Sequence, residues 1–95
     1  MTKKGDRFVA RRIAYVLNQN NKVSKCFSGV FRALAENGWL HTQRPIADNL
    51  RFLVEQKKIV HIGNQYALIQ TRENGTKFVI VKNPVENVVD LEKSD

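Results

Sequence analysis

The sequence predicts an α+β fold in which three helices are followed by a two- to three-stranded antiparallel β-sheet. Apolar residues recur at intervals of three and four between residues 6 and 57, which is the pattern of helices with one buried face. From residue 58 onward the pattern changes to alternation, interrupted by the turn sequences Gly63-Asn64 and Asn74-Gly75. A chain of 95 residues has room for one domain.

The first helix is expected over residues 6–18. Asp6 suits the N-cap position, and the polar run from Gln19 to Asn21 suits the end of the helix. The stripe opposite its apolar face carries Arg7 and Arg11, and such a stripe is either a solvated surface or a source of phosphate contacts. The residues predicted to be buried are Val9, Ala10, Ile13, Val16 and Leu17.

The second helix is expected over residues 25–37, with Ser24 as its N-cap. Asn37-Gly38 has the order typical of a helix C-terminus, where a left-handed backbone is needed. Trp39 and Leu40 are expected to fill the core beside the following turn, and the alternative for Trp39 is stacking on a nucleic-acid base. The predicted apolar seam of the helix is Phe27, Val30, Phe31 and Leu34.

The third helix is expected over residues 42–57, with Thr42 as its cap and Pro45 in its first turn. Its inward face is predicted to hold Ile46, Leu50, Leu53 and Val54. Its outer face has both signs of charge, because it carries Arg44, Asp48, Arg51, Phe52 and Glu55. Such a mixture is compatible with reading base edges, since arginine bridges guanine and a carboxylate accepts a hydrogen bond from cytosine.

The remainder of the chain predicts a three-stranded antiparallel meander. Residues 58–62 and 65–69 flank Gly63-Asn64, which suits a type II′ turn, and Asn74-Gly75 suits a type I′ turn before residues 76–81. This last strand is apolar on both faces, so its edge is expected to be covered by the acidic tail or by a second subunit. The tail itself is expected to dock as a short helix or to remain mobile.

The charge of the chain is unevenly distributed. There are 16 lysine and arginine residues against 9 aspartate and glutamate residues, which gives a net charge of +7. The last ten residues carry −3, so the preceding 85 carry +10. A small body this positive attracts polyanions, and the alternative is a basic protein that binds nothing. No apolar run approaches the roughly 20 residues of a membrane span, and we expect a cytoplasmic protein without a membrane partner.

Few residues of the chain are suited to catalysis or metal binding. One cysteine and two histidines, Cys26, His41 and His61, do not complete a tetrahedral zinc site without carboxylates. Cys26 is expected to be a buried structural thiol and His61 a surface residue. The five glycines are dispersed and form no phosphate-binding loop. We therefore expect neither an enzyme nor a metal site nor a small-molecule cofactor.

The order of elements resembles that of the winged helix-turn-helix domain. The resemblance rests on the segment from Pro45 to Val60, which is similar to a recognition helix running into a strand, and on the hairpin from Gly63 to Leu68. It covers residues 6–69, with 76–82 as an extra strand or as the return strand of a longer wing. The implied organisation is a basic arm (1–5), a winged-helix domain (6–82) and an acidic tail (83–95).

The resemblance implies a small sequence-specific protein that binds double-stranded DNA, expected to be a transcriptional regulator, with the third helix in the major groove and the wing on the backbone. Thr42 and Asn49 are expected either to bind phosphate or to serve only as helix cap and helix surface. The wing tip is placed at Asn74-Gly75. The candidate DNA-binding residues are Gln43, Arg44, Asp48, Arg51, Lys58, Arg72, Lys77, Arg7 and Arg11.

Two further expectations concern partners. The apolar final strand, Phe52 and the cluster Val88, Val89 and Leu91 predict a homodimer. The alternative function is a winged-helix protein-interaction module within a larger assembly, because one fold serves many functions.

Overall fold

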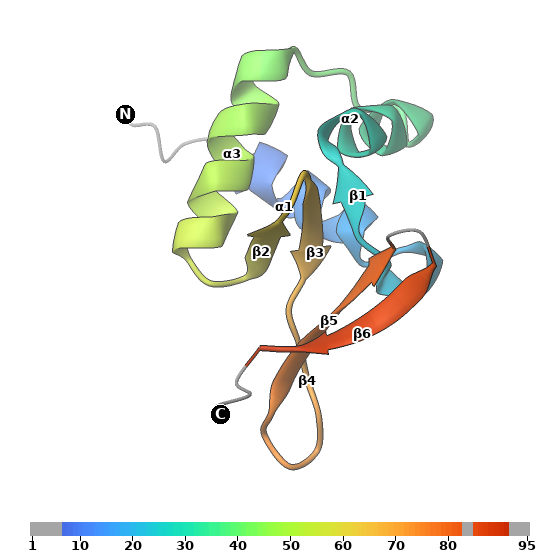
Figure 1. Cartoon of the computed structure of the whole chain (residues 1–95). Coiled ribbons are helices and arrows are strands. Elements are labelled where there is room, and N and C mark those ends of the chain that lie inside the picture. The colour runs from blue at the N-terminus through green and yellow to red at the C-terminus, as the bar shows by residue number, and fades with distance from the viewer. Residues whose placement is uncertain (1–6, 83–84, 92–95) are drawn as a thin grey trace.

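The computed structural model describes residues 7–82 and 85–91, and it shows three helices followed by antiparallel strands in two small sheets (Figure 1). One face of the first sheet packs against the helices, through Ile59, Tyr66 and Leu68. Its other face packs against the second sheet, through Val60, Ile62 and Ala67. The predicted Asp6 cap and the basic arm lie outside the described residues. Within those residues, no helix has the length and apolar character needed to cross a membrane.

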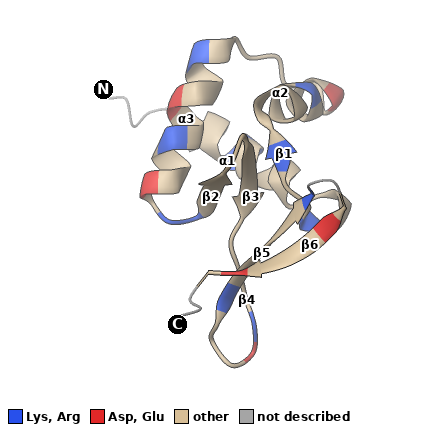
Figure 2. Cartoon of the chain, viewed as in Figure 1, with Lys and Arg blue, Asp and Glu red and all other residues tan. Residues whose placement is uncertain are grey.

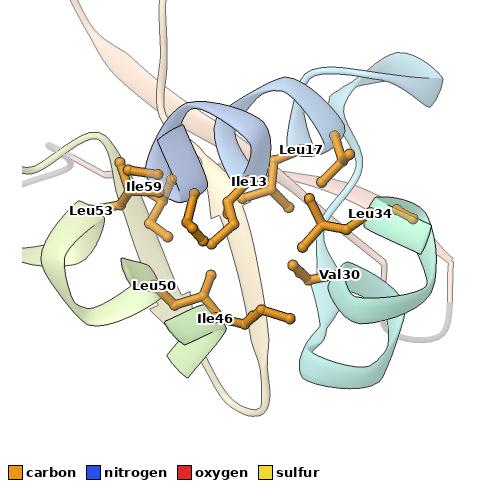
Figure 3. Close-up of a cluster of buried hydrophobic side chains, with 12 residues drawn as sticks. Ile13, Leu17, Val30, Leu34, Ile46, Leu50, Leu53 and Ile59 are labelled. Carbon is orange, nitrogen blue, oxygen red and sulfur yellow. The ribbon is translucent and has the colours of Figure 1, made fainter. Parts of the chain in front are cut away.

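The three helices form the larger of two hydrophobic cores. They are α1 (Arg7–Leu17), α2 (Phe27–Glu36) and α3 (Gln43–Glu55). Figure 3 shows that side chains from all three helices and from Ile59 point toward one another. All five residues predicted to be buried on α1 are buried, and so are three of the four predicted on α3, with Val54 partly buried against the same core. The helical periodicity of the sequence is therefore confirmed for α1 and α3.

The start of α2 differs from its prediction. The helix begins at Phe27, and Lys25–Cys26 forms a short strand, β1, that pairs with Tyr66 and Gln65. Ser24 does not cap the helix, because its hydroxyl donates to the side chain of Gln65 and accepts from the backbone N–H of Lys82. Two partners distant in sequence thus bind the Ser24 hydroxyl, which is therefore not available to cap the helix.

The end of α2 matches its prediction in the backbone but not in every side chain. Gly38 adopts the expected left-handed conformation, with φ of +84°. Trp39 packs against the edge of the helical core, as expected of a core residue. Leu40 is 82% exposed and Phe31 is 41% exposed, so the prediction that both are buried is wrong.

The first sheet has the strand order β1-β3-β2. Strand β2 (Ile59–Ile62) and strand β3 (Gln65–Leu68) form the predicted hairpin, with Ile62 opposite Gln65. Gly63 has φ of +62° and Asn64 does not have a positive φ, which agrees with the expected type II′ turn. The hairpin is therefore tight, and its turn lies beside Cys26 at the start of α2 because Cys26 pairs with Gln65.

The second sheet replaces the predicted single meander. It contains β4 (Gln70–Thr71), β5 (Lys77–Lys82) and β6 (Glu86–Asp90), in the order β4-β5-β6. The meander prediction is wrong because β5 packs Val79 and Val81 face to face against Ala67 instead of extending the first sheet. Between β4 and β5 the chain closes through the pair Arg72 and Thr76.

The loop from Arg72 to Thr76 is longer than the two-residue turn that Asn74-Gly75 predicted. The backbone N–H of Arg72 donates to the carbonyl oxygen of Thr76, and Gly75 has φ of +93°. Asn74 does not adopt a positive φ; its side-chain oxygen instead accepts from the backbone N–H of Thr76 at 3.0 Å. The positive φ at Gly75 alone is typical of a three-residue hairpin loop with a bulge.

The acidic tail forms a strand. Residues 86–90 pair with residues 78–82 of β5, with Val79 opposite Val89 and Ile80 opposite Val88. The apolar edge of β5 is therefore covered by the tail, which was one of the two expected covers, and the tail is neither a short helix nor mobile over these residues. All five residues of β6 are exposed, and Glu86 and Asp90 place negative charge on the new edge, a common protection against edge-to-edge pairing.

Candidate nucleic-acid interface

The outer face of α3 presents four of the predicted DNA-binding side chains together. Gln43, Arg44, Asp48 and Arg51 are all exposed, whereas the opposite face of the helix is buried in the core. Figure 2 shows basic and acidic residues alternating along this face. Thr42 has the extended backbone of an N-cap but makes no side-chain capping hydrogen bond. The packing of α3 thus fixes the direction in which these polar side chains point.

The two arginines of this face form no direct ion pair with a described residue. Among residues 7–82 and 85–91 the one ion pair joins Arg72 to Asp90, so neither Arg44 nor Arg51 is paired with a described carboxylate. Each guanidinium keeps its fork of N–H donors for an external acceptor. Asn49, considered as a phosphate ligand, is buried and donates to the carbonyl oxygen of Pro45 at 2.8 Å. Asn49 is therefore a buried part of the helix, and the alternative assignment, which placed it on the helix surface, is wrong.

Further polar residues lie near the β2–β3 hairpin. Lys58 follows α3 directly and is exposed. Lys25, Tyr66 and His61 lie opposite one another across β1, β3 and β2. The ring of His61 stacks on Tyr66 with centroids 4.2 Å apart, and His61 is exposed, as predicted. This hairpin therefore offers a basic and aromatic edge beside the helices.

The other predicted wing residues lie elsewhere. The β4–β5 loop projects from the end of the molecule away from α2 and the first turns of α3 (Figure 1). Arg72 binds Asp90 at 2.8 Å, and its guanidinium lies 4.4 Å from the ring centroid of Phe78. Lys77, at the base of the loop, is exposed. The structure thus separates Arg72 and Lys77 from the outer face of α3, and Arg72 is already bonded to Asp90.

The basic residues of α1 border a cleft of about 390 Å³. Arg11 is exposed on α1, and Arg12 is held by a hydrogen bond to His41 and by the ring of Trp39. Arg7 begins α1, but its side chain lies outside the described part of the chain. The cleft is lined by Arg11, Arg12, Tyr15, Asn37 and Trp39.

Sequence reasoning singled out Arg11 and Trp39 but missed the cleft that joins them. Tyr15 and Arg12 have no predicted role, because the prediction rests on the apolar face of the helix and on the arginines opposite it. The available signal was Phe8, Arg11 or Arg12, and Tyr15 at spacings of three and four, which places an aromatic and cationic stripe along the side of a helix.

Cys26 differs from its prediction. It is a free thiol that is only half-buried, and it lies at the N-cap of α2. A hydrogen bond with the hydroxyl of Ser28, 3.3 Å from the sulfur, and the backbone N–H groups of Gly29 and Ser28 hold the pKa of this thiol below its ordinary value. Hydrogen bonds to the thiolate favour the charged form.

The candidate DNA-binding residues whose side chains are described thus lie in three places: the outer face of α3 with the adjacent Lys58, the cleft beside α1, and the β4–β5 loop. The same part of the chain contains no group of three or more histidine, cysteine, aspartate or glutamate side chains placed to hold a metal ion. Comparison with known proteins gives this chain no relative, because no family model, no curated protein and no solved structure matches it.

Proposed function

We propose that the protein is a small sequence-specific double-stranded DNA-binding protein of the winged-helix type, with α3 in the major groove. The observation that carries the proposal is the outer face of α3. On it, Arg44 and Arg51 are exposed and not paired with any described carboxylate. The opposite face is fixed in the core by Ile46, Leu50 and Leu53. A helix anchored in this way holds its polar side chains in one orientation for contact with base edges.

The arrangement around α3 supports the winged-helix assignment. A short strand, β1, lies between α1 and α2 and pairs with β3, so the β1-β3-β2 sheet combines a strand that precedes α2 with the hairpin that follows α3. The β2–β3 hairpin comes directly after α3 and serves as the wing. We assign the backbone contacts to this hairpin and to Lys58, and not to the β4–β5 loop, which projects in another direction (Figure 1).

The chemistry of the exposed residues supports reading of sequence as well as attraction to phosphate. Arginine forms paired hydrogen bonds with guanine, glutamine with adenine, and aspartate accepts from cytosine. Gln43, Arg44, Asp48 and Arg51 supply all three kinds of contact. The +10 charge of residues 1–85 supplies affinity for the backbone without regard to sequence. A transcriptional regulator is the simplest use of such a small binding domain.

We also propose that the regulator acts as a homodimer. The edge of β5 is not available for this contact because β6 covers it. Val85 and Val88, which are 63% and 57% exposed, remain as an apolar surface on which a second copy can pack. A two-fold dimer would place its recognition helices about one DNA turn apart, roughly 34–36 Å. Sedimentation velocity with and without duplex DNA measures the subunit count directly.

The experiment that tests duplex binding selects preferred sites from a random duplex library and then measures affinity by fluorescence anisotropy at several salt concentrations. Arg51→Ala should weaken binding to the selected site by about 1–3 kcal/mol and relax its sequence preference. Arg32→Ala, which removes an exposed arginine from α2, is the matched control and should keep the preference. If Arg32→Ala, like Arg51→Ala, bound all duplex sequences with equal affinity, the proposal would be contradicted.

The alternative, a protein-interaction module, is favoured by one observation. Asp48 and Glu55 alternate with the arginines on α3, and Phe52 is 41% exposed on the same helix. Exposed aromatic residues are enriched at protein interfaces. The salt series separates the two functions, because DNA binding predicts that log K falls linearly with log salt concentration. Weak DNA binding that never saturates would instead favour the interaction module.

A further inference from the structure

We propose that the cleft between α1 and the α2–α3 connection binds one unpaired nucleotide of a single-stranded nucleic acid, with Tyr15 against the base and Arg11 and Arg12 toward the phosphate. None of the residues that line the cleft belongs to α3 or to the β2–β3 hairpin. The site is therefore separate from the surface proposed for duplex DNA. The site is a shallow hollow of about 390 Å³ that is open to solvent, so a bound nucleotide would stay partly exposed.

Arg12 is held in position before any ligand binds. Its guanidinium lies 5.0 Å from the ring centroid of Trp39 and 5.9 Å from that of Phe8. Its Nη1 atom donates to Nε2 of His41 at 3.1 Å. Three neighbours thus fix the direction of one charged group, and the N–H donors that they do not use can bind an anion. A side chain fixed in advance loses less entropy on binding.

The cleft also offers aromatic surface for a base. Tyr15 is 51% exposed, and its ring meets Trp39 edge-on, at 70° with centroids 5.6 Å apart. This contact orients the tyrosine ring and leaves about half of the residue open to solvent. Phe8, on the neighbouring turn of α1, is 68% exposed. Stacking on aromatic side chains beside basic groups is how single strands are bound without regard to sequence.

The charge of the cleft favours an anion that carries a planar group. Its lining includes two arginines and no carboxylate, and the one ion pair among the described residues is on the far sheet, between Arg72 and Asp90. Asn37 donates its side-chain N–H to the carbonyl oxygen of Ala33 at 2.9 Å, so its side-chain oxygen is left as an acceptor. A nucleotide satisfies all three features, because it carries a phosphate, a flat ring and hydrogen-bonding groups on the base edge.

The test uses the fluorescence of Trp39, which is the only tryptophan in the chain. The full-length protein is titrated with the single strands dT12 and U12, which share the proposed chemistry and differ in the sugar and the thymine methyl group. An unpaired base that enters the cleft contacts Trp39, so a saturable change in its emission is expected. A 12-base-pair duplex, in which the bases are stacked, should leave the emission unchanged.

Two variants and two matched controls locate the site. Arg11→Ala and Tyr15→Ala should each weaken dT12 binding about tenfold. Arg32→Ala and Phe31→Ala remove an exposed arginine and a partly exposed aromatic residue from α2, outside the cleft, and should keep the affinity within about twofold. Circular dichroism checks that all four variants are folded. An equal loss of dT12 binding in the controls and the cleft variants would overturn the proposal.

Two competitors test the class of ligand. Inorganic polyphosphate has the charge without the base, so it should displace dT12 only at much higher phosphate concentration; displacement at equal phosphate concentration would reduce the site to a charge patch and overturn the proposal. A peptide with the sequence of residues 85–95 has the acidic and apolar character of the tail. Saturable displacement of dT12 by this peptide, at lower concentration than by U12, would assign the cleft to a second copy of the chain instead.

The cleft proposal and the duplex-binding proposal can fail independently of each other. Arg51→Ala should weaken duplex binding and leave the dT12 titration unchanged, whereas Arg11→Ala should do the reverse. Loss of the dT12 response in both variants would contradict a separate cleft. An unchanged dT12 response in a protein that binds no duplex would support the cleft and refute only the major-groove assignment.

Discussion

The helical half of the molecule and its second sheet are stabilised in different ways. Among residues 7–82 and 85–91, the helical core contains twelve buried residues, whereas the core between the sheets contains three, Ala67, Val79 and Val81. The helical core depends on apolar residues that recur every three or four positions along each helix. The second sheet depends on pairing between strands, including an added strand, β6, that covers the edge of β5. Most of the buried apolar contact is therefore made by the helices, and the second sheet contributes a much smaller core.

The largest expected effect tests the difference in core size directly. Leu50→Ala removes a side chain that is 1% exposed in the helical core, and it should lower the free energy of unfolding by about 2–5 kcal/mol. Val79→Ala, at a fully buried position of the smaller core, should cost about two thirds as much because two side-chain carbon atoms are lost instead of three. Urea unfolding monitored by circular dichroism gives both values. A larger loss for Val79→Ala would reverse the ranking of the two cores.

A second variant tests how firmly the two sheets are joined. Ser24 is 8% exposed and bonds to both sheets, through Gln65 and the backbone of Lys82. Ser24→Ala leaves these groups without a partner and should cost about 1–3 kcal/mol. Ser28→Ala, an exposed serine nearby in the chain, is the control and should change stability by less than about 0.5 kcal/mol. Equal effects in the two variants would mean that water replaces the Ser24 hydroxyl.

A third pair of variants compares the two ends of the molecule in DNA binding. Lys58 lies next to α3, and Lys77 lies at the base of the β4–β5 loop; both are exposed. Lys58→Ala should reduce the salt dependence of duplex affinity by about one unit of slope, as expected for one lost phosphate contact. Lys77→Ala should leave the slope unchanged because its loop projects away from the proposed groove contact. A reduced slope for Lys77→Ala would restore the β4–β5 loop as the wing.

The smallest expected effect concerns the ion pair of the second sheet. Arg72 and Asp90 are bonded at 2.8 Å, but their side chains are 38% and 49% exposed. Asp90→Asn should therefore cost only about 0.2–1 kcal/mol, and less at high salt concentration. Thermal unfolding at low and high salt measures both quantities. A loss that salt does not reduce would show that Asp90 acts through packing or hydrogen bonding instead of charge.

The sequence predicted the helical half well because each helix is specified by local spacing. The buried faces of α1 and α3 follow from intervals of three and four alone. The start of α2 could not be predicted in this way, because Ser24 is engaged by Gln65 and Lys82, which are 41 and 58 residues away. Alternation identified β5 as a strand apolar on both faces, but it did not reveal that the chain would fold back into a second sheet.

The candidate site was predicted in part for the same reason. The exposed face of α3 follows from the spacing of its buried face, so Gln43, Arg44, Asp48 and Arg51 were correctly expected to be exposed together. The separation of Arg72 and Lys77 from that face depends on how one sheet lies on another, which local patterns do not contain. The cleft depends on the meeting of α1 with Trp39 and His41, which are more than twenty residues away in sequence.

The position of Ser24 also has a consequence for the order in which the chain folds. Contacts that close long loops form late, since their entropic cost must be met before they stabilise the chain. The serine can join its two partners only after β3 and β5 have both found their places, whereas α1, α2 and α3 can associate beforehand. We therefore expect substitutions at this serine to accelerate unfolding while leaving the refolding rate nearly constant, which stopped-flow kinetics would record as a change in one arm of the chevron plot.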